Sequence, residues 1–319
     1  MADDAGGWST IESDEGLFTS LIEELGVKNV QFEELVSLDA DTIRSLNTVY
    51  GVIFLFKWTS GQTRNDRAPH DGTYDRSVAD NHGLFFAAQT IQNACGTQAI
   101  LSVILNQDTR IDIGPELRDF KDFTTGFPAD LRGEALSNSA PIRNAHNSFA
   151  RASPFADETA RAPAGADDDA ELYHFIAYTP FNGVLYELDG LQPAPISHGP
   201  CDAASFPERV IEVLQRRVAR YPEGEIRFNL MAVVEDPRAR AAEMNDELKL
   251  QSEENKRRAW AWENALRRWN FVGFIGEILK GVVGMKVAGG QDEYEKWVKE
   301  ARQETTKKLN MRRTGGAGE

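Results

Sequence analysis

Apolar and polar positions along the chain follow patterns that predict its secondary structure. Between residues 13 and 26 apolar side chains recur at helical spacing and end at a glycine, which predicts an amphipathic helix with Ser13 as its N-cap. Residues 49–58 are rich in β-branched and aromatic side chains and predict a buried strand. Residues 59–83 are polar, contain Pro69 and several glycines, and predict a loop.

Further along, the pattern predicts a buried helix that begins near Cys95, because residues 99–104 carry apolar side chains along one helical face. Between residues 137 and 170 this periodicity disappears and the composition turns to Ala, Ser, Pro, Asn and Asp. We expect a long mobile loop there, of the kind that often serves as a lid. A helix is predicted over residues 206–221 and a strand over residues 226–234.

Beyond Pro237 the chain becomes rich in charged residues, alanine and tryptophan at helical spacing, and glycines between positions 273 and 290 are its only breaks. The simplest division is therefore one domain over residues 1–236 and a helical extension over residues 237–319. The final residues of the extension are expected to be disordered.

Apolar side chains in this extension leave two roles open. They could pack against the first domain or dock a partner helix. One stripe consists of Phe271, Phe274, Ile275, Ile278, Leu279 and Val282. The tryptophans present the same choice between core residues and interface anchors, and they are Trp260, Trp262 and Trp269.

Composition narrows the classes of function. Hydrophobic residues at 41% and charged residues at 27% are typical of a globular protein with a sizeable core. The longest apolar runs are far shorter than the roughly 20 residues that cross a bilayer, and the start of the chain lacks the features of a signal peptide. We therefore expect no membrane partner and no secretion. A net charge of −15 argues against nucleic-acid binding and favours a basic partner or peptide.

The two cysteines, Cys95 and Cys201, are too few for a disulfide scaffold and suit a reducing compartment. No close spacing of His and Cys predicts a structural zinc site, and no motif predicts a cofactor. One of the two thiols could instead be reactive.

Cys95 has the surroundings of a nucleophile. A thiol reacts as its thiolate, which a helix N-terminus and a nearby imidazolium both favour. Its small neighbours Ala94 and Gly96 would leave the sulfur accessible, and Gln89 could present its amide to a developing oxyanion. On these residues alone, a buried core cysteine at the head of an apolar helix remains an equal alternative.

We seek the general base in a predicted hairpin, where two apolar runs flank the Pro-Phe-Asn-Gly segment at 180–183. If the loop has four residues, His174 faces Asp189 across the strand pair, and the carboxylate could orient the ring. A two-residue loop would instead pair His174 with Leu191. A core histidine with a structural role is the alternative for His174.

Three segments resemble the active-site motifs of the ubiquitin C-terminal hydrolase family of cysteine peptidases. They are QTIQNACGTQA at 89–99, YHFIAY at 173–178 and LYELDGL at 185–191. The N-terminal stretch with Trp8 and residues 18–26 is similar to that family as well, so the resemblance covers most of residues 7–236.

This resemblance implies an α/β (α+β) architecture: a papain-like cysteine protease fold whose central antiparallel sheet is flanked by helices. It implies a deubiquitinating thiol protease, a ubiquitinyl hydrolase, that cuts after the terminal glycine of ubiquitin and ubiquitin conjugates. Cys95 would be the nucleophile, His174 the general base and acid, Asp189 its orienting partner and Gln89 the oxyanion donor. The segment over 137–170 would be the crossover loop above the active site.

Residues 253–258 and 267–280 resemble the C-terminal extension, called the ULD, of the proteasome-associated branch of that family, with Gly273 where the family usually has proline. In that branch the extension binds the adaptor domain of a proteasomal ubiquitin receptor, which activates the hydrolase. Residues 296–308 are similar to its charged tail. We expect a protein of the cytoplasm, of the nucleus or of both.

Two other classes of function use the same residues. A weakly active or inactive ubiquitin-binding scaffold would depend mainly on the extension, although the complete set of predicted catalytic residues argues against it. A thiol redox protein would use Cys95 and Cys201, but no Cys-x-x-Cys motif supports it.

Overall fold

The computed structural model describes residues 7–46, 48–57, 68–81, 83–150, 173–222, 227–269 and 271–315. Its contacts form two compact units, a first that holds the described residues up to Arg268 and a second that begins at Trp269.

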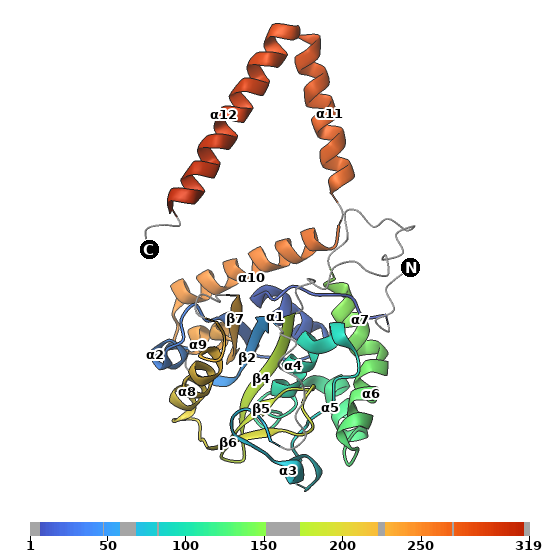
Figure 1. The fold of residues 1–319 in the computed structure, drawn as a ribbon, viewed down its shortest axis with the longest axis vertical. Helices are drawn as coiled ribbons and strands as arrows, with labels where there is room; N and C mark the ends of the chain where they lie inside the picture. Colours follow the sequence, from blue (N-terminus) through green and yellow to red (C-terminus); the bar gives the residue numbers. More distant parts are fainter. Residues whose placement is uncertain are drawn as a thin grey trace. The chain divides into compact units, whose positions relative to one another are not determined.

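The first unit is built on a seven-stranded sheet with the order β1-β7-β2-β4-β5-β6-β3 (Figure 1). Its strands are β1 (Val30–Glu34), β2 (Val49–Lys57), β3 (Thr73–Tyr74), β4 (Tyr173–Phe181), β5 (Val184–Leu188), β6 (Ile196–Pro200) and β7 (Phe228–Glu235). All the pairs between these strands are antiparallel. The strands predicted over 49–58 and 226–234 are confirmed as β2 and β7.

Helices cover both faces of this sheet. They are α1 (Glu15–Glu24), α2 (Ala40–Ser45), α3 (Arg76–Asn81), α4 (Cys95–Ile104), α5 (Gly114–Phe123), α6 (Ala129–Asn138), α7 (Ala140–Ser148), α8 (Phe206–Val218), α9 (Pro237–Glu243) and α10 (Glu247–Arg267). One apolar core lies under α1 and α4 to α7, and a second lies under α2 and α8. Because side chains alternate along a strand, Ala177 of β4 enters the first core while Ile176 and Tyr178 enter the second. The predicted α/β architecture with helices flanking an antiparallel sheet is confirmed.

The N-cap predicted for the first helix is wrong by one residue. Asp14 caps α1, and its Oδ1 accepts a hydrogen bond of 2.8 Å from the backbone of Leu17. The Ser13 hydroxyl instead donates to Asn229 Oδ1 at 2.9 Å. A carboxylate in this position also suits the positive end of the helix dipole.

Two predicted loops are shorter than their composition indicates. The stretch over 59–83 contains β3, whose pairing with the distant strand β6 leaves no signal in the local sequence, and it also contains α3. The stretch over 137–170 contains all of α7, which begins because Ser139 caps it and Pro141 suits its first turn. Residues 58–67 and 151–172 lie outside the described part of the chain, so the crossover loop stays a prediction over most of its length.

Helices α9 and α10 belong by their contacts to the first unit. The Trp260 ring of α10 is buried and lies directly on Gly16 of α1, where an added Cβ would come within 2.3 Å of the indole. The Asn264 side chain donates to the Gly16 carbonyl at 3.2 Å, and Arg267 Nη2 lies 2.8 Å from Asp14 Oδ2. The domain boundary predicted between residues 236 and 237 stays a prediction. The contacts of the first unit continue to Arg268.

The second unit consists of α11 (Val272–Ala288) and α12 (Gln291–Gly315). The expectation that glycines break this region is wrong for the positions from 273 to 284, which lie inside α11. A lone glycine lowers helix stability by roughly 1 kcal/mol but keeps its backbone hydrogen bond, so a long apolar helix tolerates it. The break comes at Gly290, whose φ of 110° lies outside the helical region.

Candidate active site

Cys95 is the first residue of α4, and every residue of this helix is buried. Its neighbour Gly96 lies against Phe175 of β4, since a Cβ at Gly96 would be 3.5 Å from the Phe175 ring. The start of α4 therefore lies next to the start of β4. Sequence and structure agree on the helix that begins near Cys95.

His174 is the second residue of β4, and its ring is buried between Asp189 and Cys95. The ring Nε2 donates to Asp189 Oδ1 at 2.7 Å. The Cys95 thiol is the other hydrogen-bonding partner of the imidazole. Because Nε2 is occupied by the carboxylate, Nδ1 is the ring nitrogen left to face the sulfur. The structure thus brings Cys95, His174 and Asp189 into one chain of contacts.

The charges around His174 favour the protonated form of its imidazole ring. Burial by itself would lower the pKa of His174, but the charge and hydrogen bond of Asp189, together with those of Cys95, outweigh it and raise the pKa to about 9. At neutral pH the ring is therefore an imidazolium. Such a cation beside a thiol stabilises the thiolate, which is the form that attacks a carbonyl.

Asp189 is fixed by more than the imidazole. Its Oδ1 also accepts a 3.0 Å hydrogen bond from the backbone of Leu191, and its Oδ2 accepts one of 3.3 Å from Gln192 Nε2. Burial would raise the pKa of Asp189, but the positive charge and the hydrogen bond of His174, together with the hydrogen bond from Leu191, hold it below its usual value. The carboxylate is thereby kept ionised and aimed at the ring.

The register predicted for the hairpin is wrong. Phe181 pairs with Val184, which leaves only Asn182 and Gly183 in the turn. Both turn residues have positive φ values, 47° and 78°, as a two-residue type I′ turn requires. The ladder ends at the pair of Ala177 and Leu188, so Asp189 leaves the strand and reaches His174 diagonally.

Gln89 lies beside the segment that carries Asp189. Its backbone N–H donates to the carbonyl of Gly190 at 2.8 Å. Gly190 is confined, because a Cβ there would lie 2.2 Å from Gln98 Nε2 and 3.0 Å from Gln89 Cβ. Gln98, one turn after Cys95 on α4, donates to the Ala87 carbonyl at 2.6 Å. These contacts tie Gln89, Asp189 and α4 together.

Gln98, Gly190 and His146 are three residues near the site to which the sequence analysis gave no role. Gln98 and Gly190 lie inside the motifs at 89–99 and 185–191, so the sequence could have indicated that both are close to the active site. His146 is buried on α7, where its Nδ1 lies 2.7 Å from Thr97 Oγ1 and its Nε2 donates to the Ser9 carbonyl at 2.6 Å. It fastens the N-terminal segment to α4 two residues after Cys95, and its polar sequence context gave no hint of this.

The second cysteine has a different environment. Cys201 follows β6, lies in the core under α8 and is a free thiol, as is Cys95. Burial raises the pKa of the Cys201 thiol, which makes it less reactive. This environment suits a structural cysteine.

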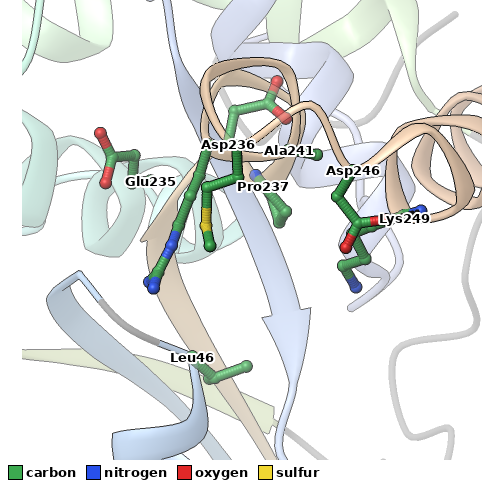
Figure 2. Close-up of a pocket in the computed structure, with 9 residues that line it drawn as sticks. Leu46, Glu235, Asp236, Pro237, Ala241, Asp246 and Lys249 are labelled. Carbon is green, nitrogen blue, oxygen red and sulfur yellow. Dashed lines mark hydrogen bonds between the residues drawn. The ribbon is translucent and has the colours of Figure 1, made fainter.

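A cavity of about 280 Å³ lies apart from these residues, between the end of β7, α9 and the start of α10 (Figure 2). It is lined by Leu46, Glu235, Asp236, Pro237, Arg240, Ala241, Met244, Asp246 and Lys249. None of the predicted catalytic residues lines it. Within the described residues no group of three or more His, Cys, Asp or Glu side chains could hold a metal ion. The described helices include none that is long and apolar enough to cross a membrane.

Comparison with known proteins decides the family. The model of ubiquitin carboxyl-terminal hydrolase, family 1, matches residues 8–219, and a second model described as ubiquitin carboxyl-terminal hydrolases matches residues 245–283. The chain belongs to the ubiquitin carboxyl-terminal hydrolase family. It is accordingly a hydrolase of the cysteine-dependent, deubiquitinating type.

Relatives within this family match most of the chain. Ubiquitin carboxyl-terminal hydrolase 2 of Schizosaccharomyces pombe is 51% identical over 282 residues, which are 86% of this chain and 91% of that protein. Ubiquitin carboxyl-terminal hydrolase ubh-4 of Caenorhabditis elegans is 37% identical over 87% of this chain and 88% of its own.

A solved structure supports the fold assignment. The crystal structure of Trichinella spiralis UCH37 bound to ubiquitin vinyl methyl ester matches with a TM-score of 0.61 and 32% identity. The match covers 82% of this chain and 99% of that one. The predicted papain-like fold of this hydrolase family, with a C-terminal extension, is confirmed.

Proposed function

We propose that this hydrolase cleaves the bond after the C-terminal glycine of ubiquitin, with Cys95 as nucleophile, His174 as general base and acid, Asp189 as its orienting partner and Gln89 as oxyanion donor. The observation that carries the proposal is the chain of contacts from Asp189 through His174 to Cys95. The solved relative bound to ubiquitin vinyl methyl ester supports ubiquitin as the recognised group. The net charge of −15 suits the basic tail of ubiquitin.

In the first half of the reaction the Cys95 sulfur attacks the glycine carbonyl, and the carbonyl oxygen gains negative charge. A side-chain amide donor at Gln89 and the N-terminus of α4 would stabilise that charge. The His174 imidazolium then gives its proton to the leaving amine as the carbon–nitrogen bond breaks. The product is a thioester between ubiquitin and Cys95, and a neutral imidazole.

In the second half the neutral His174 takes a proton from water as the water oxygen attacks the thioester. The carbon–sulfur bond breaks, and ubiquitin leaves with a free carboxylate. Cys95 leaves as the thiolate and His174 is again an imidazolium, which restores the starting pair. Asp189 holds the ring and stabilises its charged form in both halves.

Turnover of a ubiquitin C-terminal amide tests these roles. We expect Cys95→Ala to remove turnover, and Gln89→Ala to lower kcat by about 100- to 1000-fold, as loss of an oxyanion donor does elsewhere. Full activity of Cys95→Ala would overturn the mechanism. No turnover by the wild type, even with a proteasomal adaptor present, would favour the scaffold alternative.

We further propose that the C-terminal extension binds the adaptor domain of a proteasomal ubiquitin receptor, and that the protein works in the cytoplasm or nucleus. The supporting observation is α11, whose large apolar side chains are exposed. They include Phe274, Ile275, Ile278 and Leu279, and Phe271 at the N-cap of the helix is exposed as well. A helix with such a surface fits a partner that covers it with another apolar face.

Substitutions on α11 test this partner. We expect the double variant Phe274→Asp, Ile278→Asp to lose binding of the isolated adaptor domain in calorimetry, while turnover of a small ubiquitin amide without adaptor stays unchanged. Glu277→Ala, also on an exposed position of α11, is the matched control and should bind as the wild type does. Undiminished binding by the double variant would place the adaptor surface elsewhere.

A further inference from the structure

Two buried carboxylates lie close together at the end of one strand of the first unit. Glu187 on β5 and Asp189 directly after it are separated by one residue, so they follow the same face of the sheet as Leu185, which packs in the core under α8. Both are almost entirely buried, at 5% and 2% exposure. Two like charges in such a place repel each other unless a cation compensates them.

Arg217 of α8 supplies that cation. Its Nη1 lies 2.6 Å from Glu187 Oε1, and its side chain is 13% exposed. The guanidinium carbon lies 4.6 Å from the centre of the Phe56 ring, within the range of a cation–π contact. Phe56 is the residue opposite His174 in the ladder of β2 and β4, and the two rings are perpendicular at 5.7 Å.

We propose that Arg217 is a positioning residue for the catalytic pair. It balances Glu187, so that Asp189 stays ionised next to a second buried carboxylate, and it holds the Phe56 ring against His174. This inference rests on the proposed roles of His174 and Asp189 in hydrolysis. Arg217 itself acts only through these neighbours.

The electrostatics support this arrangement. Burial would raise the pKa of Glu187, but the charge of Arg217 and the hydrogen bond from His198 keep it below its usual value. The charge of Arg217 also contributes to the lowered pKa of Asp189, after the larger influence of His174. The charge of the guanidinium therefore favours the ionised form of both carboxylates.

A purely structural role explains Arg217 less well. A buried ion pair usually stabilises a fold no more than a well-packed apolar pair of the same volume. Among the described residues, Arg217 Nε is also buried without a hydrogen-bond partner, which adds a cost. A charge retained at that cost is better explained by its effect on the neighbouring Asp189.

Kinetics of the full chain with a ubiquitin C-terminal amide tests the proposal, with active sites counted by a ubiquitin probe that carries a thiol-reactive electrophile. Arg217→Met keeps most of the volume and removes the charge. We expect it to lower kcat per active site at least tenfold and to change KM less than threefold, because the Arg217 side chain is only 13% exposed and Asp189 acts after substrate has bound. Arg217→Lys keeps the charge and should remain within threefold of the wild-type kcat.

The double variant Arg217→Met, Glu187→Gln removes both charges and should recover kcat to within threefold of the wild type. If the salt bridge of Arg217 were only structural, Arg217→Met would lower the melting temperature but leave kcat per active site unchanged. That result would overturn the proposal. A double variant as slow as Arg217→Met would overturn it as well. Retained activity in Cys95→Ala would show separately that the underlying mechanism is wrong.

Discussion

His174 Nε2 lies 2.7 Å from Asp189 Oδ1, although the two residues do not face each other in the ladder of β4 and β5. Continuing the observed register by one residue places Asp189 opposite Ile176, two positions along the same face from His174. Diagonal neighbours on a sheet are about 7 to 8 Å apart at Cα, a distance that an imidazole and a carboxylate bridge together. The contact that orients the imidazole therefore forms because both side chains reach across the diagonal, at the point where β5 ends.

The first prediction concerns pH. Because the charge of Asp189 helps to raise the pKa of His174 to about 9, Asp189→Asn should lower that pKa. The imidazolium would then lose its proton at lower pH, and the alkaline limb of kcat/KM should move to lower pH, with a maximum reduced by roughly tenfold or more. Profiles of both proteins between pH 5 and 10 measure this; coincident alkaline limbs would contradict the assignment of Asp189.

The second prediction concerns Gly190. An added Cβ there would lie 2.2 Å from Gln98 Nε2 and 3.0 Å from Gln89, so Gly190→Ala should displace the segment that carries the oxyanion donor. We expect kcat to fall about tenfold or more, since small displacements of catalytic groups have large effects.

Gly281→Ala is the matched control, because nothing lies within 4 Å of its added Cβ on α11. It should leave kcat unchanged and stabilise the helix by up to about 1 kcal/mol. Equal kinetics for Gly190→Ala and Gly281→Ala would mean that the contacts of Gly190 do not position Gln89.

The third prediction concerns where the catalytic unit ends. A chain that stops at Asp236 loses Trp260 from α1 and also loses Arg257, whose Nη2 lies 3.0 Å from the buried Asp236. A chain that stops at Arg268 keeps both. We expect the shorter chain to be less stable by several kcal/mol, because removal of a buried tryptophan alone costs about 3 to 5 kcal/mol. Urea unfolding compares the two, and equal unfolding free energies would place the boundary at residue 236.

Sequence patterns predicted the elements whose signals are local. The strand β2 and the helix that begins at Cys95 carry dense apolar residues, and the turn residues at 180–183 predicted the hairpin, although its loop has two residues where four were predicted. The contacts among Cys95, His174 and Asp189 were also predicted, through the family resemblance of the motifs on α4, β4 and β5.

The remaining features depend on contacts between distant parts of the chain. β3 has only two residues and exists because it pairs with β6. The burial of Trp260 on Gly16 needs a helix from the C-terminal region to return to α1. The charge balance between Glu187 and Arg217 joins β5 to α8. No local periodicity or residue spacing in the sequence indicates any of these three contacts.

The most direct test of the account is labelling by a ubiquitin probe with a thiol-reactive C-terminal electrophile, followed by mapping of the modified cysteine. Wild type, Cys95→Ala and Cys201→Ala are compared at equal folded concentration. The account predicts one adduct on Cys95 in the wild type and in Cys201→Ala, and none in Cys95→Ala. Labelling of Cys95→Ala, or an adduct mapped to Cys201 in the wild type, would contradict it.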